Sequence, residues 1–260
     1  MKIVFVSIWY SENMGYIENF LPQAIARNGH EVHILTSTAQ VYFDQPFYAK
    51  TYEKFLGPPL VKEGVYNDKG VTIHRLPFTM ILNKRIHINN LISKINDMQP
   101  DIVHSLNISD YDTLLLAFAK LGGARFKLFA ANHNGYHALF PTEETKKAFT
   151  WRKRLKWRLQ FTIPGRFISW FTEKCFAATT DSAEIALNWY GMQKNKIKVT
   201  PLGVDTMQFH PDESKRNKMR DSLGYTDDEI VCIHTGKLTD FKNPMLLADA
   251  IKILNERYNL

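Results

Sequence analysis

The chain has 260 residues, 45% of them hydrophobic and 23% charged, with a formal net charge of +7. This composition is ordinary for a globular protein and excludes a disordered chain or a repeat array. The two cysteines, Cys175 and Cys232, provide neither a disulfide framework nor a metal site, which fits a reducing cytosol. No run of eighteen apolar residues predicts a membrane span, and the short apolar run at residues 3–7 indicates a first strand rather than a signal peptide.

Short apolar runs alternate with helical patterns along most of the chain. The runs are nearly continuous rather than alternating with polar residues, as in parallel strands that are covered on both faces. The expected strands are 3–7, 31–36, 71–76, 102–105, 127–131, 176–179 and 198–200, and the expected helices are 16–28, 89–98, 111–121, 143–160 and 182–190. This order predicts an α/β fold, a Rossmann-like doubly wound parallel sheet. The aromatic-rich stretch 40–69 is too long for a simple connection, so we expect a functional loop there.

The last 55 residues differ from the rest. After residue 205 the sequence predicts a charged helix, a strand at 230–235 and a helix from Pro244 to about Tyr258. One strand and one helix cannot complete a parallel sheet, because each needs neighbours to cover its apolar face. We therefore expect a first domain at 1–205 and, at 206–260, an incomplete second Rossmann-like domain.

Several sequence pieces resemble the family 4 glycosyltransferases, retaining enzymes of the two-domain GT-B architecture. These pieces are Gly29-His30-Glu31-Val32, Gln99-Pro100-Asp101-Ile102-Val103-His104, Lys198-Val199-Thr200-Pro201-Leu202-Gly203-Val204-Asp205, Phe209-His210-Pro211 and the loop from Gly236 to Pro244. Each piece alone is weak, but their order and spacing are specific and cover essentially the whole chain. The resemblance implies an N-terminal acceptor-binding domain followed by the start of a nucleotide-sugar-binding domain.

Two lysines in the loop before Pro244 are candidates for the donor diphosphate. Lys237 and Lys242 flank a turn between a predicted strand and a helix N-terminus, a place suited to anions. Cations held there would stabilise the charge that develops on the leaving phosphate. The family has an Arg and a Lys in this loop, so Lys237 keeps the charge without the bidentate geometry of arginine. Gly15, in the loop after the first strand, is expected to let a backbone N–H approach the phosphate from the facing side.

The acceptor side is expected at the carboxyl ends of strands. Asn132 and His133 follow the strand at 127–131 directly, and His133 matches a histidine that the family places beside the transferred sugar. His104 ends another strand, where a structural role and an acceptor contact are both open. Tyr16, after Gly15, completes the predicted acceptor-binding set. Catalytic roles are assigned to His133, Lys237 and Lys242.

Residues 146–166 contain eight lysines and arginines and no acid. A helical projection at 100° per residue puts Ala148, Trp151, Leu155, Leu159 and Thr162 on a stripe that should face the core. Lys153, Arg154, Trp157 and Phe161 fall on the opposite side, and aromatic residues among cations are typical of an interfacial membrane helix. An anionic membrane surface and a solvated charged face both remain open. Binding to nucleic acid is not expected, since no recognised motif accompanies the charge.

These features predict a glycosyltransferase that moves a hexose-type sugar from a UDP- or GDP-sugar to a glycan or lipid-linked acceptor in polysaccharide or envelope biosynthesis. We expect no metal and no cofactor, because the nucleotide sugar is a substrate. The expected location is the cytoplasm, with peripheral attachment at the inner face of the membrane. The 260 residues alone are expected to be inactive. The alternatives are the acceptor- or membrane-binding half of a split glycosyltransferase with a partner subunit, and a GT-B sugar-nucleotide epimerase, against which the 236–244 loop argues.

Overall fold

A computed structural model describes residues 1–260 except 82–84, 141–143, 145–146, 148, 237–241 and 259–260. The described residues form two compact units, Met1–Thr206 and Met207–Leu260. The sequence predicted a domain boundary after residue 205. Each unit is described by itself.

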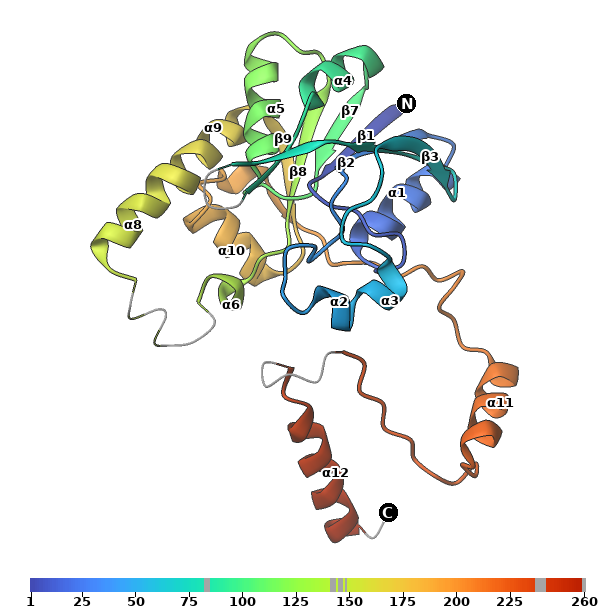
Figure 1. The fold of residues 1–260 in the computed structure, drawn as a ribbon. Helices are drawn as coiled ribbons and strands as arrows, with labels where there is room; N and C mark the ends of the chain where they lie inside the picture. Colours follow the sequence, from blue (N-terminus) through green and yellow to red (C-terminus); the bar gives the residue numbers. More distant parts are fainter. Residues whose placement is uncertain (82–84, 141–143, 145–146, 148, 237–241, 259–260) are drawn as a thin grey trace. The chain divides into compact units, whose positions relative to one another are not determined.

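The first unit is built on one mostly parallel eight-stranded sheet with helices on both faces (Figure 1). Its strand order is β10-β9-β8-β7-β1-β2-β4-β3. The strands are β1 (Lys2–Ser7), β2 (Glu31–Ser37), β3 (Gly64–Asp68), β4 (Val71–Leu76), β7 (Ile102–Ser105), β8 (Lys127–Asn132), β9 (Thr172–Ala177) and β10 (Ile197–Val199). Only β3, at one edge, pairs antiparallel to its neighbour among these strands. The predicted doubly wound α/β fold is confirmed.

The central strand β1 shows how the sheet buries both faces. Val4 and Val6 belong to a core cluster with residues of α4 (Leu91–Met98) and α5 (Tyr111–Leu121). Ile3 and Phe5 belong to a different cluster, against which α1 (Ile17–Arg27) packs. Because side chains alternate along a strand, these two clusters lie on opposite faces of the sheet. A third cluster, over β8 and β9, includes residues of α10 (Thr180–Asn188).

The predicted elements are largely present, but three segments differ. Strand β9 begins at Thr172 and ends at Ala177, four residues before the start predicted at Phe176 and two before the end predicted at Thr179. The stretch 40–69, predicted as a loop, contains α2 (Tyr48–Thr51), α3 (Glu53–Leu56) and β3. A hairpin of β5 (Phe78–Ile81) and β6 (Arg85–Ile88) was not predicted; it is a separate two-stranded sheet, and its strands are only four residues long. A short α6 (Tyr136–Leu139) and a 3₁₀ turn, η3 (Lys194–Lys196), complete the unit together with the segment described next.

Residues 151–171 form one helical segment, which we call the 151–171 helix. It consists of α8 (Trp151–Trp157), the π-helical η2 (Arg158–Thr162) and α9 (Ile163–Phe171), so it extends beyond the predicted end at Gln160. The predicted start at residue 143 lies outside the described residues, but Phe149 and Thr150 are not helical, so the segment begins later than predicted, at Trp151. A π turn takes more residues than an α turn, and it shifts the helix faces relative to a uniform projection of 100° per residue.

The orientation of the 151–171 helix is opposite to the prediction. Trp157 Nε1 donates a hydrogen bond to the Trp189 carbonyl oxygen over 3.0 Å, and the Trp157 and Phe161 rings stack with centroids 4.3 Å apart. Both rings pack against the core cluster that contains Tyr190, so their assignment to a membrane surface is wrong. Of the stripe predicted to face the core, Trp151, Leu155 and Leu159 are exposed, with Leu155 at 50% of its full accessibility. Thr162 does face the core and donates a hydrogen bond to the Trp189 carbonyl oxygen at 2.7 Å, and Ala148 lies outside the described residues. Large apolar side chains lie on both sides of the helix, and the aromatic surface around Trp189 determines which of them are buried.

Two glycines hold the 151–171 helix against the chain that follows α10. A Cβ on Gly165 would overlap the carbonyl oxygen of Tyr190. Gly191 has a φ of +74°, and a Cβ there would overlap the carbonyl oxygen of Thr162. Backbone therefore meets backbone at this crossing, where only glycine fits at either position.

The second unit contains α11 (Glu213–Leu223) and α12 (Pro244–Tyr258). The Asp212 side chain caps α11 by accepting a hydrogen bond from the Lys215 backbone N–H at 3.0 Å. The strand predicted at 230–235 is wrong: these residues are irregular, and Ile230 and Ile233 are 75% and 77% exposed. A β-strand needs a hydrogen-bonding neighbour, and no strand of the second unit's described residues supplies one.

Candidate functional site

The sheet has a topological switch point between β1 and β7. From β1 the chain builds β2 and β4 on one side, and from β7 it builds β8, β9 and β10 on the other. The two loops that leave the carboxyl ends of β1 and β7 therefore diverge, which leaves a crevice of the kind where α/β sheets bind ligands.

A cavity of about 230 Å³ lies beside these loops. Ile8 and Trp9 follow β1, and Ser109, Asp110 and Tyr111 follow β7. The rest of the wall comes from Phe43, Asp44, Arg85, Ile86 and Phe161. A narrower pocket of about 20 Å³ shares Arg85, Asp110 and Phe161 with it and reaches Leu114, Pro164 and Ile168. We call the two together the switch-point pocket.

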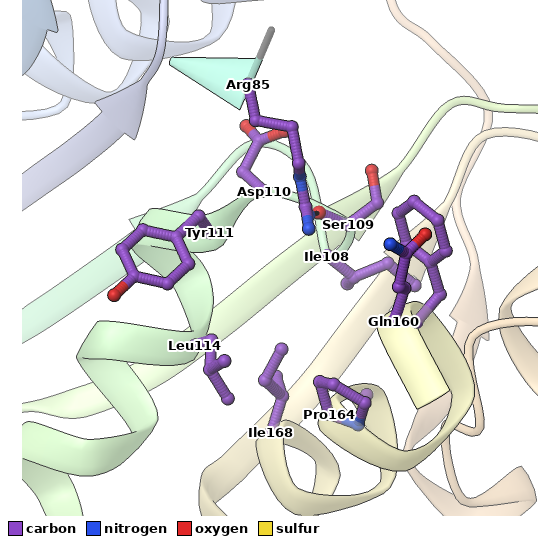
Figure 2. A pocket seen from close by; sticks show the side chains of 11 residues that line it. Arg85, Ile108, Ser109, Asp110, Tyr111, Leu114, Gln160, Pro164 and Ile168 are labelled. Atoms are coloured by element: carbon purple, nitrogen blue, oxygen red, sulfur yellow. Dashed lines mark hydrogen bonds between the residues drawn. The ribbon is translucent and has the colours of Figure 1, made fainter. Parts of the chain in front are cut away.

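Polar and apolar side chains lie at different ends of this pocket (Figure 2). The guanidinium of Arg85 donates a hydrogen bond to the Ser109 carbonyl oxygen, and its central carbon lies 5.0 Å from the centroid of the Phe161 ring. Arg85, Ser109 and Asp110 lie toward one end of the pocket in the close view, and Leu114, Pro164 and Ile168 lie toward the other. The pocket thus has a polar end and an apolar end.

Asp110 is the N-cap residue of α5, but its side chain makes no capping hydrogen bond. A capping aspartate ordinarily accepts from the second or third backbone N–H of its helix. Here the carboxyl group lines the pocket instead. Desolvation and the nearby Asp112 raise the pKa of Asp110 to about 7, while the positive charge of Arg85 opposes that rise. A carboxyl group in this position can accept from, or donate to, a ligand hydroxyl.

The wall that carries Arg85 is fixed by a buried carboxylate on α5. Asp112 is fully buried; its Oδ1 lies 2.6 Å from His87 Nδ1, and its Oδ2 accepts a hydrogen bond from the Ile88 backbone N–H at 3.0 Å. Burial raises the pKa of Asp112, and the hydrogen bond from His87 lowers it. These contacts join β6 to α5, and they hold Arg85 over the loop that contains Asp110.

The two predicted histidines lie near each other at the neighbouring strand ends. His104, on β7, is buried between the rings of Phe5 and Phe176, with centroids 5.2 Å and 5.7 Å away. Burial and the nearby His133 lower the pKa of His104 to about 4, so its ring is neutral at pH 7. Its Nε2 is buried without a hydrogen-bond partner in the part of the chain that the structure describes. His133 lies just after β8 and is exposed at the surface. Desolvation by the protein that surrounds its ring still lowers its pKa.

Asn132 and Tyr16 occupy structural positions. Asn132 is fully buried, and its Nδ2 donates to the Ser182 carbonyl oxygen at 2.7 Å. The Tyr16 hydroxyl lies 3.0 Å from the Tyr42 hydroxyl, within an aromatic cluster under α2 and α3. Burial and the bond to Tyr42 raise the pKa of Tyr16. Both residues can position the loops of the site, and their predicted contacts with an acceptor stay predictions.

The predicted phosphate-binding residues belong to different units of the chain. Gly15 is exposed in the loop after β1, with a φ of +72°, so the turn itself requires glycine. Lys242 is exposed in the second unit, two residues before α12 begins at Pro244. Lys237 lies outside the described residues. The donor site therefore stays a prediction.

Sequence analysis missed Arg85 and Asp110. The signal for Asp110 was available, because Ser109 and Asp110 follow the strand that ends at Ser105 just as His133 follows the next strand. Arg85 gave no such signal, since it lies on a short hairpin strand that is not part of the main sheet. No cluster of three or more histidines, cysteines or acids that could bind a metal occurs among the described residues.

The sequence profile of Glycosyltransferase Family 4 matches residues 21–208. The chain belongs to this family. Two D-inositol 3-phosphate glycosyltransferases are each 32% identical to it over short segments. The match to the protein of Xylanimonas cellulosilytica covers 88 residues, 32% of this chain and 21% of that protein. The match to the protein of Geodermatophilus obscurus covers 78 residues, 30% of this chain and 17% of that protein.

Solved structures show the same fold. HepE from Anabaena, in complex with UDP-glucose, aligns with a TM-score of 0.54 and 18% identity, over 96% of this chain and 57% of that one. A glycosyltransferase from Rickettsia africae aligns with a TM-score of 0.54 and 15% identity, over 98% of this chain and 58% of that one. The chain thus has the α/β architecture of GT-B glycosyltransferases, and it spans a little over half the length of these two proteins.

Proposed function

We propose that this protein is the acceptor-binding part of a nucleotide-sugar-dependent glycosyltransferase. The complete enzyme would transfer a hexose-type sugar from a UDP- or GDP-sugar to a glycan or lipid-linked acceptor in polysaccharide or envelope biosynthesis, with retention of anomeric configuration. Membership of the family supports the reaction class, and the HepE complex with UDP-glucose supports a nucleotide-sugar donor. We place the reaction in the cytoplasm, at the inner face of the membrane.

The main support for the proposal is that the carboxyl group of Asp110 makes no capping hydrogen bond to α5 and lines the switch-point pocket instead. An acceptor sugar presents several hydroxyl groups and an apolar ring face. Asp110 and Arg85 supply a hydrogen-bond acceptor and donors, and Trp9 and Tyr111 supply aromatic surface. A site with this combination binds polar ligands that also have apolar faces.

The donor side of the proposal rests on Lys242 and Lys237, with Gly15 contributed by the loop after β1 of the first unit. The two cations would hold the donor diphosphate, and His133 would lie beside the reacting sugar. Loss of a phosphate-binding cation should lower turnover on the order of 10²–10³-fold, by analogy with the loss of an oxyanion donor. No metal and no cofactor take part in this scheme.

The proposal is tested by transfer from labelled UDP- and GDP-hexoses to extracted lipids and glycans, using the longest open reading frame that contains this chain. Asp110→Asn should raise the KM for acceptor about tenfold, because one charge-assisted hydrogen bond is lost. Lys242→Ala should lower kcat, whereas Lys252→Ala, an exposed lysine on α12, should not. Full turnover in Lys242→Ala would contradict the assignment of Lys242 to the donor diphosphate. An unchanged KM for acceptor in Asp110→Asn would contradict the assignment of the switch-point pocket to the acceptor.

A further inference from the structure

An exposed apolar stripe runs along the 151–171 helix on the side away from the protein core. Its members repeat at intervals of three or four residues, with Phe167 half-buried between the last two. They are Trp151, Leu155, Leu159, Ile163 and Trp170, exposed by 68%, 50%, 59%, 53% and 62%. At 1.5 Å per residue the stripe is about 28 Å long. Isolated exposed apolar residues need no explanation, but a continuous row of large ones marks an interaction surface.

The π-helical turn η2 helps to keep this row on one face. In an α-helix, a row spaced by four residues drifts around the axis by about 40° per step. The wider winding of residues 158–162 reverses this drift between Leu159 and Ile163. The stripe therefore stays on one side of the segment for its whole length.

Exposed cations lie along the same helical segment, and no acid occurs within it. Six exposed basic side chains lie on α8, η2 and α9: Arg152, Lys153, Arg154, Lys156, Arg158 and Arg166. The sequence has no aspartate or glutamate between Glu144 and Glu173. The Arg152 guanidinium lies 5.4 Å from the centroid of the Trp151 ring, which places positive charge next to the aromatic surface. A partner for this face must be apolar within and negatively charged at its surface.

We propose that this face of the 151–171 helix binds the surface of an anionic lipid bilayer, with the helix lying in the interface plane. Leu155, Leu159 and Ile163 enter the acyl boundary, and the basic side chains contact lipid phosphates. The residue set differs from the sequence prediction, because Trp157 and Phe161 are buried against the protein. No helix in the described parts of the chain is long and apolar enough to cross a membrane, and an interfacial helix needs no such span.

The opposite face of the same helix favours a lipid-linked acceptor over a soluble glycan. This part of the inference rests on the proposed function. Gln160, Phe161 and Pro164 line the switch-point pocket. A helix with its side chains is about 10 Å thick. An acceptor in the pocket therefore lies about one helix diameter from the bilayer surface, within reach of a lipid-linked sugar whose anchor stays in the membrane.

Membrane binding is tested with the 260-residue protein and with lipid vesicles that contain no acceptor. Sedimentation with vesicles of 70% phosphatidylcholine and 30% phosphatidylglycerol should carry most of the protein down, and vesicles of phosphatidylcholine alone should not. The double variant Leu155→Ser/Leu159→Ser should bind at least tenfold more weakly, because two apolar side chains no longer enter the bilayer. Arg152→Gln, which removes the cation beside Trp151, should lower the affinity for these vesicles about fivefold. Leu121→Ser, which changes an equally exposed leucine at the end of α5, is the matched control and should bind normally.

A second measurement uses the unmodified protein. Lipids with brominated acyl chains should quench its fluorescence, and Trp151→Phe and Trp170→Phe should each reduce the quenching. Equal binding to neutral vesicles, or no loss in the leucine double variant, would overturn the proposal. So would a dimer in solution that the double variant converts to monomers without any vesicle binding, because a second copy would then cover the face. Transfer to soluble acceptors is measured separately, so failure of the proposed reaction leaves the vesicle result intact.

Discussion

The inner and outer faces of the 151–171 helix have similar apolar content and opposite surroundings. On the inner face, Trp157 and Phe161 pack against Tyr190 and the third core cluster. On the outer face, Leu155 and Leu159 are at least half exposed. Hydrophobicity alone therefore does not determine which side of a helix is buried. The neighbouring surface does, and here that surface combines aromatic rings with a glycine crossing that lets the backbones meet.

The largest effect is expected at the glycine crossing. Gly165→Ala places a methyl group on the Tyr190 carbonyl oxygen, and the helix can relieve the overlap only by moving off the core. We expect a loss of about 3 kcal/mol in the free energy of unfolding, measured by urea denaturation. Gly64→Ala, where a Cβ would meet nothing within 4 Å, should cost less than about 0.5 kcal/mol. Equal losses in both variants would mean that the crossing does not fix the helix.

A smaller effect should separate the two faces directly. Trp157→Ala removes a partly buried ring and its hydrogen bond to Trp189, so we expect a loss of about 2–3 kcal/mol in the same assay. Leu155→Ala removes an exposed side chain from the same helix and should change the stability by less than about 0.5 kcal/mol. A greater loss of stability in Leu155→Ala than in Trp157→Ala would show that Leu155, and not Trp157, faces the core.

The smallest effect concerns Asp110, which faces the inner side of the helix across the switch-point pocket. Its folded pKa of about 7 lies above the value near 4 of an unfolded aspartate. Its contribution to stability is therefore complete below about pH 4 and is lost as the pH rises through 7. Asp110→Asn cannot ionise, so the stability that it gains over the wild type should be smaller at pH 4.5 than at pH 8. At pH 8 it should exceed the wild type by about 1–2 kcal/mol, a figure discounted for the partial exposure of this residue.

Urea denaturation at pH 4.5 and pH 8 measures this difference. Asp97→Asn, which changes an exposed carboxylate on α4, provides the control at both pH values. An Asp110→Asn variant with the same pH dependence as the wild type would show that this carboxyl group is as well solvated in the pocket as in the unfolded chain.

The sequence predicted the parallel sheet well, because buried parallel strands are short continuous apolar runs with a helix between them. It also indicated one edge of the site, since His104 and His133 end or follow neighbouring strands. The β5–β6 hairpin was missed because four-residue strands leave almost no periodic signal. Arg85 was missed for the same reason, since it lies on β6. The inner face of the 151–171 helix was predicted wrongly, because the apolar stripe was assigned to the core, whereas the aromatic rings that stand among the cations on the other side, Trp157 and Phe161, pack there.

The second unit shows a different limit of sequence reasoning. The run from Ile230 to His234 has strand-like composition, but it forms no strand, and its apolar side chains are exposed. A strand depends on hydrogen bonds to a neighbour, whereas a helix satisfies its own backbone. This explains why α12 forms as predicted in the same unit while the predicted strand does not.

The central place of β1 has a consequence for how the chain is made. Ile3 pairs with Val32 on one side and with Ile102 on the other. During synthesis from the N-terminus, the first pairing becomes available long before the second. Until Ile102 leaves the ribosome, one edge of an apolar strand stays open, and open strand edges recruit other chains. The nascent protein passes through a stage in which premature release favours aggregation, and a chaperone that covers the open edge of β1 would raise the yield of folded protein.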